Sequence, residues 1–272
     1  MKGDDFLTRN IAGFTRVLES VISTEDISHA HGLLQSLDPR VKLVSFLLFI
    51  VTVSLVHSLI VLGSIFALIM ILSLASKISL GLFLKRVLIF VPIFTLVIAV
   101  PALFLTPGQP LINILGKVII TQQGGLSAAF LILRVTNSLS LGVLLILTTP
   151  WSNILVALRW VRIPSLLVDI LGMTYRYMFL LLHSANSMFI ARRSRVIGSF
   201  SGSENRRWLS RALATTMAKS QRLSEDVYLA MLSRGYHGEV RVLNEFNLKR
   251  RDFLWIAFSL AAIVFLFWVS RL

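Results

Sequence analysis

The apolar positions of this chain come in long runs, and the polar positions gather between and after them. The apolar runs cover residues 43–75, 86–105, 126–148 and 253–270. About 20 apolar residues in an α-helix cross the ~30 Å hydrocarbon core of a membrane. The pattern therefore predicts an all-α integral membrane protein.

The first run is too long for one membrane span, and His57 and Ser58 interrupt it. We interpret it as a tight hairpin of two short helices. The sequence alone leaves open whether this hairpin crosses the membrane completely or re-enters it. Together with the other runs it gives about five transmembrane helices, over residues 42–57, 59–76, 86–105, 126–148 and 253–270.

Local signals refine this pattern. Asp38 and Pro39 open the first span, because Asp caps free backbone N–H groups and Pro suits the first helical turn. Residues 106–125 contain several Pro and Gly and are predicted to form a loop. Residues 5–22 place apolar side chains at helical spacing opposite a polar face. This amphipathic helix lies either on the membrane surface or on the protein's own core, and the spacing does not separate the two.

The polar segment after the fourth span is also predicted to be helical. A short helix covers residues 152–160, a long one covers 164–195, and a third covers 206–234, with a turn over 198–205. The third helix carries a stripe of residues spaced by threes and fours, which suits packing against another helix. The stripe consists of Leu209, Leu213, Thr216, Ser220, Leu223, Val227 and Ala230.

Charge divides the chain in the same way. Residues 39–168 contain no Asp or Glu, whereas residues 190–252 contain thirteen Lys and Arg. Because Lys and Arg flank the spans on one side, the positive-inside rule places the N-terminus in the cytoplasm and the C-terminus outside a cytoplasmic (inner) membrane. The predicted parts are a cytoplasmic N-terminal segment (1–38), four spans (39–150), cytoplasmic helices (151–252) and a last span (253–272).

Composition changes this picture little. The mean hydropathy is +0.80 and the formal net charge is +14. On a membrane protein, a basic excess marks cytoplasmic segments more often than nucleic-acid binding. The chain has no cysteine, which excludes disulfides, thiolate metal sites and a Cys nucleophile.

Motifs for catalysis and metal binding are missing from the sequence. Gly116 and Lys117 have neither the upstream Gly nor the following hydroxyl of a phosphate-binding loop. His29 and His31 lie close together, but a transition-metal site usually needs a third ligand. No nucleophile lies in a pattern with a base. We therefore expect no enzyme activity, no cofactor and no metal site, and spans without carboxylates argue against a cation pathway through this chain alone.

Arg134 is a charge inside the fourth predicted span. An intramembrane charge is costly and normally faces other protein or water. It contacts a partner subunit, pairs internally with Asp169, or extends toward the membrane interface. The sequence favours none of these roles.

Two consecutive predicted helices end in similar sequences, Ala191-Arg192-Arg193 and Ser233-Arg234-Gly235. An Arg near a helix C-terminus suits the helix dipole, and a Gly there adopts the left-handed cap conformation. That explains one such end without any function. Two such ends favour a docking device, because a guanidinium binds carboxylate or carbonyl oxygens in bidentate fashion.

At these residues the chain resembles the transmembrane coupling component (T component) of energy-coupling factor (ECF) transporters, of the cobalt/nickel CbiQ type. That family carries two short Ala-Arg-Gly-like motifs at the ends of cytoplasmic coupling helices. Here Arg193 replaces Gly in the first motif and Ser233 replaces Ala in the second, whereas Arg192 and Arg234 are retained. Further likenesses lie at residues 37–42, at Arg134 with 147–150, at 175–177 and at 234–238. The subtype rests on Glu25-Asp26 and residues 32–35.

The resemblance implies an assembly. Two cytoplasmic ABC ATPase subunits would bind ATP, a separate membrane subunit would bind the substrate, and this chain would couple them without catalysis in cobalt or nickel uptake. A vitamin-type substrate is the alternative within the family, since the substrate contacts lie in another chain. Two other classes remain: a self-contained transporter of a neutral or anionic substrate, and a membrane-anchored basic protein. The basic helices lack interleaved aromatic residues, so we expect the lipid bilayer as a partner and no nucleic acid.

Overall fold

The computed structural model describes Gly13 and residues 32–105, 110–114, 117–195, 202–238 and 249–271. The chain divides into two compact units. The apolar unit comprises Glu25–Ala157 and Phe246–Leu272, and the long-helix unit comprises Met1–Thr24 and Leu158–Glu245. Each unit is described by itself.

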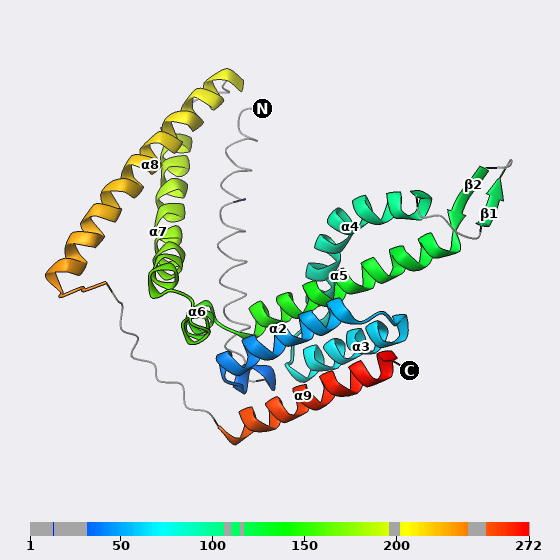
Figure 1. Cartoon of the computed structure of the whole chain (residues 1–272). Coiled ribbons are helices and arrows are strands. Elements are labelled where there is room, and N and C mark those ends of the chain that lie inside the picture. Colours follow the sequence, from blue (N-terminus) through cyan, green and yellow to red (C-terminus); the bar gives the residue numbers. More distant parts are fainter. Residues whose placement is uncertain are drawn as a thin grey trace. The chain divides into compact units, whose positions relative to one another are not determined.

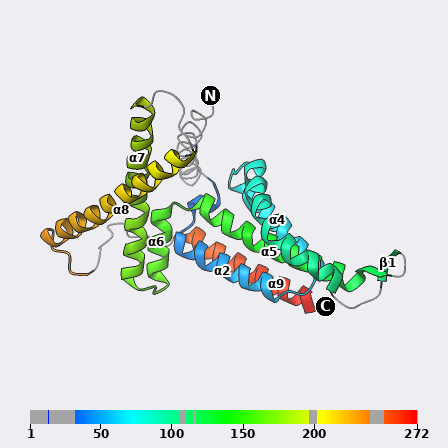
Figure 2. The same ribbon diagram turned by 90° about the horizontal axis from the view of Figure 1, so that it is seen from above.

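The apolar unit is built from helices that pack side by side (Figures 1 and 2). After the short 3-10 helix η1 (Leu34–Ser36), α5 contacts α2, α3 and α4, while α9 contacts α2 and α3. The bounds are α2 Pro39–Leu55, α3 Leu59–Ala75, α4 Leu80–Leu105, α5 Gln122–Thr148 and α9 Arg250–Arg271, and α6 (Trp151–Trp160) follows α5. The last span of the sequence therefore returns to the first, so that residues far apart in the chain share one core.

The core of the apolar unit combines close packing with a few interhelical hydrogen bonds. Phe46, Phe49 and Leu144 are almost fully buried in it. The Asn137 side-chain amide donates to the Leu62 carbonyl oxygen at 2.9 Å, across the contact between α5 and α3. In a membrane, packing and such hydrogen bonds hold helices together, because lipid tails are as apolar as the side chains.

The predicted division of the first apolar run into two helices is confirmed, with α2 and α3 separated by residues 56–58. The Asp38 carboxylate accepts a hydrogen bond from the Arg40 backbone N–H at 2.9 Å, and Pro39 occupies the first turn. The third helix begins at Leu80, earlier than predicted, and continues to Leu105.

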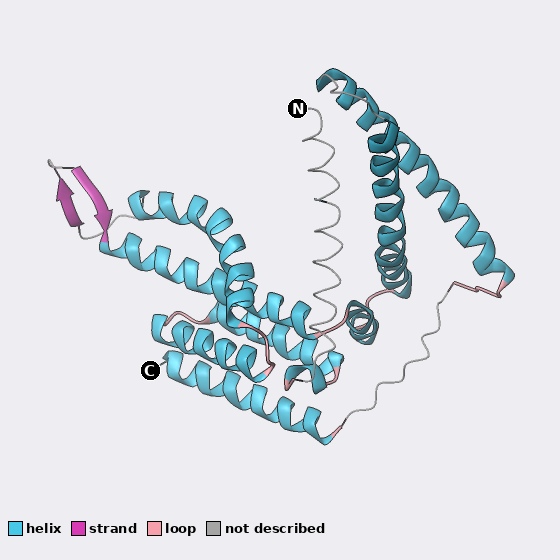
Figure 3. Ribbon diagram, turned by 180° about the vertical axis from the view of Figure 1, so that it is seen from behind, coloured by secondary structure: helices cyan, strands magenta, loops and turns pink. Residues whose placement is uncertain are grey.

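The loop predicted over residues 106–125 is wrong where the structure describes it. Strands β1 (Pro110–Ile114) and β2 (Lys117–Thr121) pair antiparallel, with Ile112 opposite Ile120 (Figure 3). Apolar and β-branched residues in these strands outweigh the Pro and Gly signals. Gly124 and Gly125 lie inside α5, which begins at Gln122.

The long-helix unit consists, in its described part, of α7 (Ser165–Arg195) and α8 (Gly202–Ser233). Pro164 precedes α7 as predicted, and its carbonyl oxygen accepts from the Leu167 backbone N–H at 3.0 Å. The helix α8 begins four residues before its predicted start, so residues 202–205 are helical and not part of a turn. The amphipathic helix predicted over residues 5–22 lies outside the described residues, apart from Gly13.

The chain is an all-α membrane protein, and its described residues include a short β hairpin. Within the described residues, α5, α7 and α9 are long and apolar enough to cross a membrane, and α3 is a shorter apolar helix. Two of these three helices, α5 and α9, correspond to predicted spans. The third, α7, lies in the segment that the charge pattern assigns to the cytoplasm. The number of five spans and the domain bounds stay predictions.

Candidate functional site

The C-terminus of α8 presents an exposed arginine on a fixed backbone turn. The Tyr236 N–H donates to the Met231 carbonyl oxygen and the Gly235 N–H donates to the Leu232 carbonyl oxygen, both at 3.0 Å. This pair of bonds is the Schellman motif, which needs a left-handed residue next to the end. Gly235 supplies it with φ +80°. Arg234, just before this turn, is exposed.

At the C-terminus of α7, the first arginine of the motif, Arg192, packs against α8. Arg192 is only 9% exposed, and its Nη2 donates to the Asn205 side-chain oxygen at 2.8 Å. Its guanidinium lies 4.4 Å from the centre of the Trp208 ring, within cation–π range. Arg192 is therefore buried against the beginning of α8. Its neighbours Ala191 and Arg193 are exposed.

The contacts of Arg192 also define where the two arginine motifs lie. Phe189 meets Trp208 edge to face at 4.8 Å, so the end of α7 is attached to the beginning of α8. Arg234 lies at the other end of α8. At 1.5 Å per helical residue, the 29 residues from Asn205 to Arg234 span about 44 Å. The two motifs are thus widely separated along one helix.

The stripe predicted on α8 faces α7 but is not buried by it. All stripe residues except Ala230 line a groove of about 980 Å³ between α7 and α8. Lys219 Nζ donates to Ser184 Oγ at 2.8 Å across the two helices, and Leu213 is 62% exposed. The helices are inclined to each other (Figures 1 and 2), and no described residue of α8 is buried. Close packing along the whole of α8, as the stripe predicts, is therefore wrong.

Arg134 belongs to the apolar unit and has an internal contact. Its Nη2 donates to the Val56 carbonyl oxygen, at 3.0 Å, at the C-terminus of α2. A cation at this end of a helix is favoured by the helix dipole. Asp169 forms an ion pair with Arg159, ten residues earlier. The suggested pair of Arg134 with Asp169 stays a prediction.

Lys42 is a functional candidate that the sequence reasoning did not single out. Its side chain is only 1% exposed, and Nζ donates to the Thr148 carbonyl oxygen and to Thr149 Oγ1, both at 3.0 Å. It thus caps the end of α5, just before α6. Residues 37–42 and 147–150 each resemble the family, but no sequence pattern shows that they meet.

A carboxylate ties the beginnings of α2 and α9 together. Asp252 Oδ1 accepts from the Asp38 backbone N–H at 2.8 Å, and Oδ2 accepts from the Lys249 backbone N–H at 2.7 Å. Trp255 Nε1 donates to Ser45 Oγ at 3.0 Å one turn further along. This end of the apolar unit is therefore fixed by polar contacts between the first and last spans.

Metal ligands do not gather in the described part of the chain, where no group of three His, Asp or Glu side chains is placed to hold an ion. His29 and His31 lie outside the described residues.

The fold and these helix ends define a class: a helical membrane protein whose apolar helices are joined to a basic pair of long helices. The sequence matches the family described as CbiQ, cobalt transport protein, over residues 31–245, and the chain belongs to this family.

Similar proteins support this assignment. An uncharacterized protein of Methanocaldococcus jannaschii is 33% identical over 93% of this chain and 88% of its own length. The cobalt transport protein CbiQ of Rhodobacter capsulatus is 30% identical over 54% of this chain and 62% of its own. The energy-coupling factor transporter transmembrane protein EcfT of Listeria innocua is 28% identical over 75% and 81%. The chain is thus related to transmembrane components of ECF transporters.

Proposed function

We propose that this chain is the non-catalytic coupling subunit of an ECF-type importer and transmits the motion of two ABC ATPase subunits to a separate membrane subunit that binds the substrate. The observation that carries the proposal is the pair of arginine motifs at two ends about 44 Å apart along α8. Such a distance suits contacts with two different subunits better than one shared contact. Membership in the CbiQ family, described as cobalt transport proteins, supports cobalt as the substrate. Nickel, which the resemblance also implies, and a vitamin are the alternatives.

The ATPase contacts are assigned to Ala191-Arg192-Arg193 and to Ser233-Arg234-Gly235. Arg234 is exposed on a rigid turn, so its five N–H donors meet a partner's carboxylate or carbonyl groups without an ordering cost in the backbone. In the first motif Arg193 is the exposed guanidinium, and Arg192 fixes the helix end that presents it.

The groove between α7 and α8 suits the substrate-binding membrane subunit. Its walls are mainly apolar, and α7 is apolar enough to lie at membrane depth. An apolar helix of a membrane partner would fill the groove and bury Leu213 and Leu223. ATPase movement at the helix ends would then tilt α7 and α8 and so change the partner subunit, a rigid-body mechanism.

The proposed orientation follows the positive-inside rule, with the N-terminus and the arginine motifs in the cytoplasm and the C-terminus outside. The ATPases reach the motifs only from that side. Arg134 is assigned a structural contact with Val56 first, and a contact with a partner subunit second.

The test is co-purification of the ATPase subunits with a chain carrying Arg193→Ala and Arg234→Ala, followed by metal uptake in cells. Losing a buried charged contact at an interface costs about 2–5 kcal/mol, so we expect the ATPases to be released and uptake to stop. Arg211→Ala with Arg222→Ala removes the same charge from exposed positions along α8 and should keep both. A fully active complex from the first double variant would refute the proposal.

A further inference from the structure

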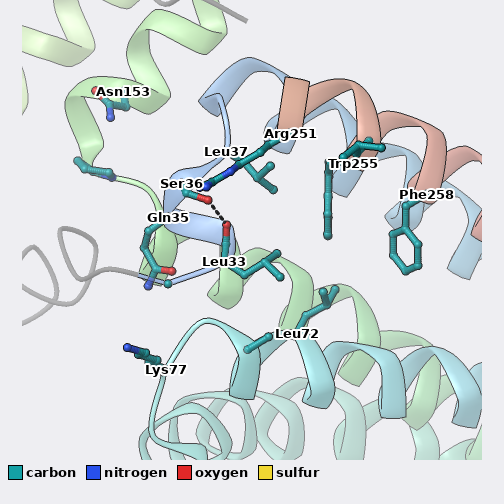
Figure 4. A pocket seen from close by; sticks show the side chains of 14 residues that line it. Leu33, Gln35, Ser36, Leu37, Leu72, Lys77, Asn153, Arg251, Trp255 and Phe258 are labelled. Atoms are coloured by element: carbon teal, nitrogen blue, oxygen red, sulfur yellow. Dashed lines mark hydrogen bonds between the residues drawn. The ribbon is translucent and has the colours of Figure 1, made fainter. Parts of the chain in front are cut away.

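A cavity of about 1020 Å³ opens at the end of the apolar unit where α2 and α9 begin and α3 ends (Figure 4). Its apolar wall includes Leu33, Leu72, Leu254, Trp255 and Phe258. The indole of Trp255 is held in place by its bond to Ser45. Leu254 is 72% exposed and Phe258 is 46% exposed, so this wall of the cavity is open to the surrounding lipid or solvent.

Two cations lie at this cavity, Lys77 in the turn after α3 and Arg251 in the first turn of α9 (Figure 4). No Asp or Glu is among the lining residues. Lys77 has φ 55°, a left-handed backbone that glycine and asparagine adopt more readily than lysine.

The position of the cavity along the apolar unit corresponds to the level of lipid headgroups. The spans α2 and α9 begin here, and basic residues on this side are those that the positive-inside rule assigns to the cytoplasmic face. Anionic lipids are enriched in the cytoplasmic leaflet, and basic pockets between transmembrane helices bind their headgroups. The cavity therefore combines apolar walls for acyl chains with cations for a phosphate.

We propose that this cavity binds an anionic phospholipid, with its headgroup between Lys77 and Arg251 and an acyl chain along Leu72, Trp255 and Phe258. Gln35, whose side-chain amide donates to the Ser76 carbonyl oxygen at 3.1 Å, fixes the turn that carries Lys77. The lipid would fill the space between η1, α3 and α9 and hold this end of the apolar unit together. No residue of the two arginine motifs lines this cavity.

The experiment is native mass spectrometry of the full chain in detergent, titrated with phosphatidylglycerol or phosphatidylcholine. Wild type should bind one phosphatidylglycerol more tightly than phosphatidylcholine. Each cation near a lipid surface contributes about a fivefold gain in affinity, so Lys77→Gln with Arg251→Gln should weaken phosphatidylglycerol binding about 25-fold. The matched control, Lys85→Gln with Arg250→Gln, removes two exposed charges that do not line the cavity and should bind as wild type.

A second pair of variants tests the space for the acyl chain. Ala75 lines the cavity, and Ala67 is exposed on the same helix outside it. Ala75→Trp should abolish binding while both cations remain, and Ala67→Trp should not. Equal affinity for the two lipids, displacement by glycerol 3-phosphate, or unchanged binding in the Lys77/Arg251 variant or in Ala75→Trp would each overturn the proposal. Unchanged binding in these variants would mean that the lipid binds elsewhere on the protein.

Discussion

Arg192 and Arg234 lie at similar ends of consecutive helices and have different surroundings. Arg234 projects from a turn closed by backbone hydrogen bonds, whereas Arg192 is held by Asn205 and Trp208 of the next helix. A buried guanidinium that stacks on an indole and bonds an amide is a positioning group. We therefore assign different tasks to the two retained arginines.

Replacing Trp208 tests the positioning task of Arg192. Trp208→Ala removes the ring that Arg192 and Phe189 contact, and Phe/Trp→Ala changes in cores cost about 3–5 kcal/mol. Because Trp208 is only partly buried, we expect about half that loss. Limited proteolysis should cut the segment between α7 and α8 faster, and ATPase binding should weaken although every motif arginine remains. Trp160→Ala, at an exposed tryptophan, is the control.

A second prediction for a single residue concerns the buried Lys42. Lys42→Met keeps the length of the side chain but leaves the Thr148 carbonyl and the Thr149 hydroxyl without their donor. An unsatisfied buried polar group costs about 1–3 kcal/mol. The melting temperature of the purified chain should fall by several degrees. Lys85→Met, at an exposed position, should leave it unchanged. An equal or higher melting temperature for Lys42→Met would show that the buried ammonium does not stabilise the end of α5.

At the scale of elements, α8 presents an apolar stripe to a groove that α7 does not close. Since Leu213 is exposed in this chain, a charge there costs the free chain little, and it costs several kcal/mol once a partner buries it. A charged substitution in the stripe therefore tests assembly with a partner and leaves the fold of the chain intact.

Leu213→Asp and Leu223→Asp should therefore give chains that insert into the membrane and retain the ATPases but lose the substrate-binding subunit and metal uptake. Ala218→Asp adds the same charge at an exposed position of α8 that does not line the groove. It should behave as wild type. The measurements are co-purification of each subunit and uptake in cells. Wild-type uptake by both Leu variants would exclude the groove as a binding surface.

For the whole molecule, the proposed division of labour predicts what the isolated chain lacks. It carries no phosphate-binding loop in its sequence, and residues 39–168 contain no carboxylate. The purified chain in vesicles should neither hydrolyse ATP nor take up cobalt, and both activities should appear when the ATPases and the substrate-binding subunit are added. Metal uptake by the chain alone would support a self-contained transporter instead.

The sequence by itself determined the elements of this protein. Apolar run length placed α2, α3, α5 and α9, and the Asp38-Pro39 cap and Pro164 marked two helix starts. These features are local, because helix formation depends on neighbours three or four residues apart. The β hairpin was missed because Pro and Gly were given more weight than the β-branched residues between them.

Only the tertiary structure decided which polar groups meet. Lys42 forms hydrogen bonds with residues 106 and 107 positions later in the chain, and Asp38 forms one with Asp252, 214 positions later. A local sequence pattern carries no information over such separations. The burial of Arg192 depends on where α8 begins relative to α7, so its exposure could not be read from its own motif. The apolar pattern predicts where helices form, whereas the arrangement of the helices decides which apolar faces are buried, as the exposed stripe of α8 shows. It also decides which charges become caps, contacts or binding groups.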